Sequence, residues 1–244
     1  MKLKLIATMM LINFLNCSLL VKDKSNMVAI NFYYSWPTPK DNGEIFELND
    51  TTMILYYDDY TLNKKSITNY IETEDSFEII KTYYYLLNKV GERVFYKFDS
   101  LTQNAGKKCD YDSVMKYNFF STFKFFTQES KDLFEEKQNT KTGIIMEKYV
   151  PDIKKDSTYP DTSVFYFSKK FPPVKFTFDS LVETKRKMKL TKIDFLFNKQ
   201  FDKFKQVTKP SKHLSFGIMK YDLSKEEQQV YLDFFKKYER LSDE

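Results

Sequence analysis

Short apolar runs recur along the chain, and in many of them apolar and polar residues alternate. The alternation is clearest in four segments: Arg93–Phe98, Val174–Asp179, Lys192–Phe197 and His213–Tyr221. A period of two is typical of a β-strand with one buried face. Segment Asn88–Glu92, which includes a glycine, has the composition of a tight turn. Such short connections favour antiparallel pairing of consecutive strands.

Further runs are rich in aromatic and β-branched residues, which favour strands. They are Met27–Trp36, Glu44–Leu48, Thr52–Tyr60, Ile67–Thr73, Ser76–Asn88, Thr142–Val150 and Ser163–Ser168. Asn49 and Asp50 predict a turn between the second and third of these runs. Segment Gln128–Asn139 predicts a short helix by its propensity, and residues 100–112 and 151–162 predict long polar loops. These two loops could instead separate two subdomains.

The last segment of the chain predicts an amphipathic helix. Ser224 and Glu227 have the spacing of a capping box, in which each side chain bonds the backbone N–H of the other residue. Apolar residues then recur at helical spacing: Val230, Tyr231, Phe234, Phe235, Tyr238 and Leu241. We therefore predict a single α+β domain over residues 27–244, mainly an antiparallel β-sheet, with the helix Lys225–Leu241 packed on it.

Aromatic residues are unusually frequent, with 24 Phe and 18 Tyr, and several are adjacent in strand-like runs. Neighbours in a strand point to opposite faces, so aromatic residues must lie on both faces of the sheet. Either both faces are covered, or some of the rings line a cleft for a ligand. The candidate ligand-binding residues are Tyr33, Trp36, Tyr57 and Tyr84.

The N-terminal segment has the pattern of an export signal. Met1–Lys4 is positively charged, and Leu5–Leu15 is a nearly continuous apolar run. A secretory signal peptide has this order, with an apolar region of about 7–15 residues. The run is too short to span a bilayer as a helix, which takes about 20 apolar residues. We therefore expect a cleaved signal peptide, with an uncleaved N-terminal anchor as the alternative.

The end of this run, Phe14–Cys17 with the letters FLNC, resembles the signal of bacterial lipoproteins. In that class the cysteine is diacylated and becomes the first residue of the mature chain; here Asn16 stands where Gly, Ala or Ser is usual. The resemblance implies lipidation of Cys17, a signal over residues 1–16 and a polar tether over residues 17–26. It also implies a membrane partner, reached through the acyl chains, and a place in the cell envelope. A secreted protein is the alternative.

The formal net charge is +5, and charges of both signs are spread along the chain. Arginine is scarce, so the arginine-rich surface typical of a protein that reads nucleic-acid bases is not expected. The densest basic segment contains Lys185, Arg186, Lys187, Lys189 and Lys192. We interpret it as a solvated face, and we expect no nucleic-acid partner.

Motifs of the common cofactor and metal sites do not occur in the sequence. The five glycines form no phosphate-binding or dinucleotide motif, so we expect no cofactor. His213 is the only histidine and alternates with the apolar residues of its run, so we expect it on the surface. Cys109 is predicted to be a buried thiol, with an exposed thiol available for intermolecular pairing as the alternative. No set of His, Cys and carboxylate residues has metal-ligand spacing, so we predict no metal site.

Carboxylate pairs are the remaining candidates for acid–base chemistry. Asp58 and Asp59 adjoin in a strand-like run and are expected on opposite faces, while Asp110 and Asp112 lie in a polar loop. Neither pair identifies a catalytic residue. The resulting hypothesis is an exported, lipid-anchored envelope protein with a non-enzymatic role in binding a ligand or protein partner. An envelope hydrolase with a carboxylate-based active site is the alternative.

Overall fold

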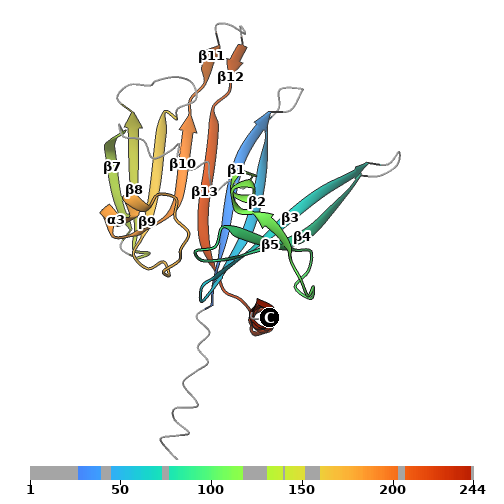
Figure 1. Cartoon of the computed structure of the whole chain (residues 1–244). Coiled ribbons are helices and arrows are strands. Elements are labelled where there is room, and N and C mark those ends of the chain that lie inside the picture. Colours follow the sequence, from blue (N-terminus) through green and yellow to red (C-terminus); the bar gives the residue numbers. More distant parts are fainter. Residues whose placement is uncertain are drawn as a thin grey trace, which may run out of the picture.

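The computed structural model describes residues 27–39, 45–72, 77–117, 131–139, 141–151, 160–202 and 207–242. Its main feature is one antiparallel sheet of 11 strands (Figure 1). The strands in chain order are β1 (Val28–Pro39), β2 (Ile45–Tyr57), β3 (Tyr60–Glu72), β4 (Phe77–Lys89), β5 (Val94–Phe98), β6 (Lys107–Asp110), β7 (Lys131–Asn139), β8 (Ile144–Pro151), β9 (Thr162–Ser168), β10 (Lys189–Phe197), β11 (Gln200–Asp202), β12 (Val207–Lys209) and β13 (Lys212–Tyr221). The helices are α2 (Tyr111–Tyr117), α3 (Ser180–Arg186) and α4 (Lys225–Ser242).

Two meanders meet in the middle of this sheet, whose strand order is β6-β5-β4-β3-β2-β1-β13-β10-β9-β8-β7. Strands β1 to β6 form one half, and β7 to β10 with β13 form the other. The junction is the pairing of β1 with β13, which places Ala29 opposite Tyr221 and Ser35 opposite Ser215. The strands β11 and β12 form a separate two-stranded ribbon. The prediction of a mainly antiparallel sheet with a C-terminal helix is confirmed.

Tight turns connect several neighbouring strands. Asp58 and Asp59 lie between the paired residues Tyr57 and Tyr60, and Asp58 has a φ of 48°. Aspartate tolerates this left-handed conformation better than most residues, so it suits the turn. The expectation that Asp58 and Asp59 point to opposite faces of a strand is therefore wrong. The expected turn between β4 and β5 is confirmed, and Gly91 there has a φ of 87°.

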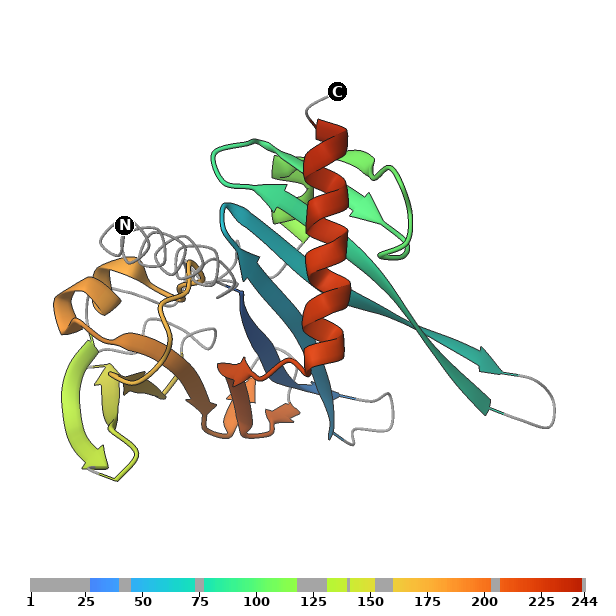
Figure 2. The same ribbon diagram turned by 90° about the horizontal axis from the view of Figure 1, so that it is seen from below.

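One face of the sheet, named the α4 face, is covered in its first half by α4 (Figure 2). The helix begins with the predicted capping box, since Glu227 N donates to Ser224 Oγ at 3.1 Å and Ser224 N donates to Glu227 Oε2 at 2.8 Å. Phe235 is fully buried and stacks on Tyr57 with ring centroids 4.9 Å apart. The buried residues of this α4 cluster are Ala29, Met53, Leu55, Tyr60, Leu62, Leu87, Phe98, Tyr231, Phe234 and Phe235.

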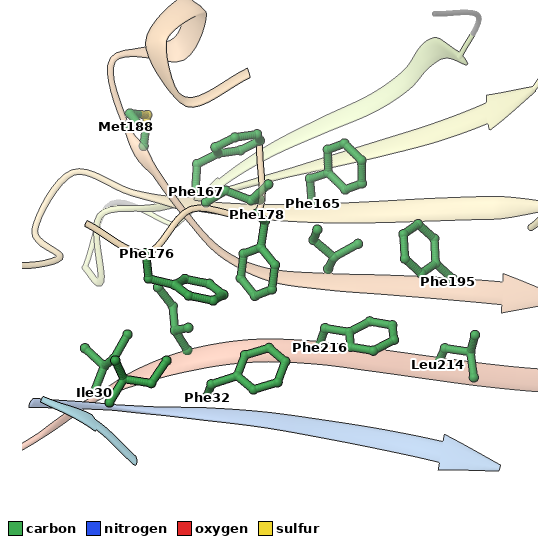
Figure 3. Close-up of a cluster of buried hydrophobic side chains, with 14 of the residues drawn as sticks. Ile30, Phe32, Phe165, Phe167, Phe176, Phe178, Met188, Phe195, Leu214 and Phe216 are labelled. Carbon is green, nitrogen blue, oxygen red and sulfur yellow. The ribbon is translucent and has the colours of Figure 1, made fainter. Parts of the chain in front are cut away.

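The opposite face is covered mainly in the second half by the strap, residues 169–188, which joins β9 to β10 and contains α3. Figure 3 shows how Phe176 and Phe178 from the strap reach the sheet beside Phe32. The rings of Phe32 and Phe176 have centroids 5.6 Å apart. We call this side the strap face. Its cluster contains Ile30, Phe32, Ile54, Tyr56, Phe165, Phe167, Phe176, Phe178, Met188, Leu190, Ile193, Phe195, Leu214, Phe216 and Ile218.

Polar bonds hold the strap in place. Asp179 caps α3 by accepting from Leu181 N at 2.9 Å. Arg186 Nη2 lies 2.7 Å from Glu147 Oε1, and the Glu147 side chain is almost completely buried. Since a buried carboxylate is destabilising unless it is paired, this contact ties α3 to β8.

Two expectations about secondary structure are wrong. Residues 131–139 of the segment expected to be helical form the edge strand β7, where pairing with β8 overrides the local propensity. The lysines and glutamates of this strand suit an exposed sheet edge. Val174–Asp179 is not a strand but an irregular part of the strap, in which buried Phe176 and Phe178 alternate with exposed Lys175 and Thr177. Alternation indicates one buried side, which an irregular segment can have without a hydrogen-bonded ladder.

Two boundaries also differ from expectation. β2 passes through Asn49 and Asp50 without a turn, because both residues pair with β1 in continuous register. The expected loop at residues 100–112 contains β6, which pairs with β5. Most of the second expected loop, residues 152–159, lies outside the described residues. Within the part of the chain that the structure describes, no helix combines the length and apolar character needed to cross a membrane.

Candidate functional site

A groove lies on the strap face of the first half of the sheet, beside the edge of the strap. It has a volume of about 430 Å³ and lies between α2 and residues 175–177 of the strap. Its apolar floor is formed by Ile54 of β2, Leu86 of β4 and Phe95 of β5. These residues share one face because the strands are paired and successive side chains alternate. The volume falls within the range of small-molecule sites.

The first wall of the groove is α2, and its position is set by two contacts with β5 and the turn before it. Tyr111 stacks on Phe95 with ring centroids 5.3 Å apart and an interplanar angle of 19°. Arg93 Nη2 donates to both carboxylate oxygens of Asp112, at 2.6 and 2.5 Å. Val114 and Met115 of α2 then line the groove.

The second wall is the strap segment Lys175, Phe176 and Thr177. Lys175 Nζ donates to the carbonyl of Asp58 at 3.3 Å and lies 3.9 Å from the carboxylate of Asp59. Lys189 Nζ donates to the carbonyl oxygen of Phe176. The wall is thus bonded to the turn between β2 and β3 through Lys175 and to β10 through Phe176.

A polar strip runs along β3 through the groove. Thr61, Asn63 and Lys65 are two positions apart and point into it, and Asn63 is only 7% exposed. Asn88 of β4 pairs with Thr61 in the sheet, and its Nδ2 donates to the carbonyl of Val94 at 2.7 Å. The line of hydrogen-bonding groups therefore runs along the middle of the floor, where Asn63 pairs with Ile54 of β2 on one side and with Leu86 of β4 on the other.

Lys65 is the charged residue of this strip. Burial lowers the pKa of Lys65 to about 8, and the nearby carboxylate of Asp50 opposes this shift without cancelling it. Lys65 Nζ lies 3.4 Å from Thr52 Oγ1, which is long for a hydrogen bond. The ammonium group is therefore mainly charged at neutral pH, in a place where the protein stabilises that charge less than water would.

Carboxylate, imidazole and thiol groups are missing from the part of the lining that the structure describes. Among the described residues that line the groove, none is Asp, Glu, His or Cys. The arrangement can hold an apolar body and orient a polar end, which is the usual composition of a binding site. Among the described lining residues, the ionisable groups are the amines of Lys65 and Lys175 and the phenols of Tyr56 and Tyr111.

A second polar patch lies on the α4 face, beyond the region that α4 covers. Its centre is Asp194, which is 5% exposed. Lys192 Nζ lies 2.9 Å from Asp194 Oδ2, and His213 Nε2 lies 3.2 Å from Asp194 Oδ1. Burial opposes ionisation of Asp194, but bonds from Lys192, Ser215 and His213 outweigh it and lower the pKa of that carboxyl. Burial next to Asp194 raises the pKa of Tyr166 to about 12.

The expectation that His213 is on the surface is confirmed, since its side chain is 53% exposed, but its contact with Asp194 was not expected. The alternation of β13 places His213 on the polar side, and the sequence carries no signal that β10 brings a carboxylate beside it.

The four predicted ligand-binding residues do not come together. The Tyr33 ring lies over Gly217 on the α4 face, where a Cβ would collide with it. Trp36 lies edge-on to Phe216 on the strap face, with centroids 6.4 Å apart. Tyr57 is part of the packing under α4.

Tyr84 is the predicted residue nearest to the groove. It pairs with Lys65 across β3 and β4, and Lys97 Nζ lies 4.9 Å from the centre of its ring. Sequence reasoning missed Lys65, Phe95 and Tyr111. The available signal was the polar spacing of Thr61, Asn63 and Lys65, which is equally typical of a solvated strand face.

Three other predictions concern cysteines and basic residues. Cys17 lies outside the described residues, so its lipidation stays a prediction. Cys109, expected to be buried, is a partly exposed free thiol. The basic segment is not simply a solvated face, because Arg186, Lys189 and Lys192 pair with Glu147, Glu183 and Asp194. Among the described residues, no cluster of three or more His, Cys, Asp or Glu side chains could hold a metal ion.

Comparison of the sequence with models of known protein families and with curated proteins found no match.

Proposed function

We propose that this chain is an exported envelope protein, attached to a membrane through lipid on Cys17, that binds a small ligand with an apolar body in the groove. The observation that carries the proposal is the groove itself, which has a volume of about 430 Å³ and a mainly apolar lining. Among its described lining residues none carries a carboxylate or an imidazole group, which favours binding over hydrolysis.

Export and anchoring rest on the N-terminal pattern. The basic Met1–Lys4 and the apolar Leu5–Leu15 support export, and the cysteine that follows supports lipidation. Two or three acyl chains on one cysteine attach a protein durably, because each buried methylene contributes about 0.8 kcal/mol. Labelling cells with an alkyne fatty acid tests this step. The Cys17→Ala variant should lose the label, and retention of label in that variant would contradict the anchor.

Ligand binding is tested with an uncharged fluorescent probe, N-phenylnaphthylamine, added to the purified exported chain. Thr61→Phe should fill the groove and reduce the bound fluorescence several-fold, because Thr61 lies on the floor between two walls. Thr51→Phe is the matched control, since Thr51 is exposed on the neighbouring strand, and it should bind the probe like the wild type. Equal binding by all three proteins would exclude the groove as the site.

The alternative of an envelope hydrolase is favoured by one observation, the contact between His213 and the buried Asp194. In such an enzyme His213 would activate a water molecule and Asp194 would stabilise the imidazolium that forms. Hydrolysis of a p-nitrophenyl ester that disappears in His213→Asn, with the fold intact, would support this alternative over the binding role.

A further inference from the structure

We infer that the ligand of the groove carries a neutral amide group, which pairs with the side-chain amide of Asn63 while the apolar body of the ligand lies between α2 and the strap. This inference rests on the proposed binding function and adds the chemical class of the ligand. The head group is that of a carboxamide or a lactam, in which an N–H donor and a C=O acceptor lie side by side as they do in asparagine.

The surroundings of Asn63 are the first support. This residue is 7% exposed and lies in the floor of the groove, within β3. Its neighbours across the sheet are Ile54 of β2 and Leu86 of β4, whose side chains cannot form hydrogen bonds. Within the part of the chain that the structure describes, the side-chain amide of Asn63 has no hydrogen-bond partner. Buried polar groups in proteins are nearly always bonded, so this amide requires an explanation.

The other asparagine of the groove, Asn88 of β4, shows what a structural amide does. Its Nδ2 donates to the carbonyl of Val94 at 2.7 Å and to that of Glu92 at 3.1 Å, so it holds the turn before β5. Asn63 serves no turn, because it lies within a strand that is paired on both sides. A buried amide without a partner destabilises the fold, and a ligand that bonds it recovers that loss.

The lining around Asn63 suits an amide attached to an apolar body. Asn63 Oδ1 can accept from the ligand N–H while its Nδ2 donates to the ligand carbonyl. Thr61 lies two positions away on the same strip, and its hydroxyl can supply a further hydrogen bond to the head group. Phe95 and Phe176 provide apolar surface for the body. Each part of the ligand thus faces groups of matching chemistry.

The charges beside the strip favour a neutral head group over an acid. Lys65 Nζ lies 3.4 Å from Thr52 Oγ1, and the carboxylate of Asp50 is near enough to attract its ammonium group. An acid drawn toward Lys65 would be repelled by that carboxylate. An amide has no net charge, so it can bond Asn63 without displacing these contacts.

The test compares 2-naphthamide with methyl 2-naphthoate, which share a ring system and a carbonyl but differ in the N–H donor, by calorimetric titration of the purified exported chain. Wild type should bind the amide about tenfold more tightly, because the ester leaves Asn63 Oδ1 without a partner. Asn63→Leu should bind the amide no better than the ester while ester binding persists. Asn31→Leu is the matched control and should keep the preference, since Asn31 pairs with Met53 on the α4 face.

A second measurement separates a binding role of Asn63 from a structural one. Without ligand, Asn63→Leu should unfold at the same urea concentration as the wild type or at a higher one, because leucine is of similar size and buries no polar group. A lower midpoint would show that Asn63 is bonded within the fold and would overturn the inference.

The binding data separate the inference from the proposed function. Equal binding of 2-naphthamide and methyl 2-naphthoate by the wild type would overturn the inference and leave the binding function standing. Tighter binding of the acid 2-naphthoate than of 2-naphthamide would do the same, because the head group would then be an anion. Binding of none of the three compounds would overturn both.

Discussion

The two halves of the sheet are covered on opposite faces. In the first half a long helix covers the α4 face and leaves a groove on the strap face. In the second half the irregular strap covers the strap face and leaves the Asp194 patch on the α4 face. Adjacent aromatic residues make both covers necessary: Tyr56 belongs to the strap cluster and its neighbour Tyr57 stacks on Phe235.

The groove at Lys65 and the polar patch at Asp194, which α4 and the strap leave uncovered, differ in the surroundings of their central charged residue. Around Asp194 the charged groups are matched, and the pKa of the carboxyl is lowered. Around Lys65 the carboxylate of Asp50 attracts the amine, but burial outweighs this attraction and lowers the pKa of the amine to about 8. The two patches therefore differ in whether the surroundings favour or disfavour the charged form of the central residue.

The largest effects on stability are expected from substitutions in α4 and in the strap, which cover the two faces of the sheet. Phe235→Ala should lower the free energy of unfolding by about 4 kcal/mol, because the ring is fully buried under a rigid helix that cannot close the cavity. Phe178→Ala in the strap should lower it by only about 2–3 kcal/mol, since an irregular segment can collapse into the space. Urea denaturation measures both values. A larger loss for Phe178→Ala would reverse this view of the two covers.

Lys65→Met should raise the free energy of unfolding by about 2 kcal/mol at pH 7. The ordinary lysine pKa is 10.5, and burial lowers the pKa of Lys65 to about 8. The folded state therefore disfavours the charged amine at full strength below pH 8, and this penalty disappears as the pH rises to 10.5. The gap between Lys65→Met and wild type should shrink over that interval in urea denaturation. A destabilised Lys65→Met protein would show that Lys65 is a structural residue.

Asp194→Asn should have the opposite sign and lower the free energy of unfolding by about 1–2 kcal/mol at pH 7. The folded-state pKa of Asp194 is lowered, so its contribution is present above the ordinary value of 3.8 and is lost as the pH falls through the folded value. The two proteins should converge in stability when the denaturation is repeated in acid. If Asp194→Asn is as stable as the wild type at pH 7, the contacts of the Asp194 carboxylate do not stabilise the fold.

The smallest expected effect concerns the start of α4. Ser224→Ala should lower the free energy of unfolding by about 1 kcal/mol, because Glu227 N loses its acceptor. Ser224→Asp should retain most of that stability. Thermal unfolding measures the loss. A loss much above about 1 kcal/mol for Ser224→Ala would mean that α4 depends on its N-terminal cap as much as on its apolar contacts.

The sequence predicts most of the long strands and the C-terminal helix because each carries its own periodic signal, but it misses β6 and predicts β7 as a helix. It predicts the strap wrongly as a strand, since Phe176 and Phe178 alternate with polar residues whether or not a neighbouring strand exists. The groove could not be foreseen for a related reason. The spacing of Asn63 and Lys65 predicts an exposed strand face, and only the tertiary fold brings α2 and the strap beside them.

The meeting of β1 with β13 has a consequence for the order of events in folding. Ala29 pairs with Tyr221, so the centre of the sheet unites residues from opposite ends of the chain. Contacts of such long sequence separation form slowly, because a large loop must close first. A chain that emerges from its N-terminus cannot complete this sheet until its last strand has arrived.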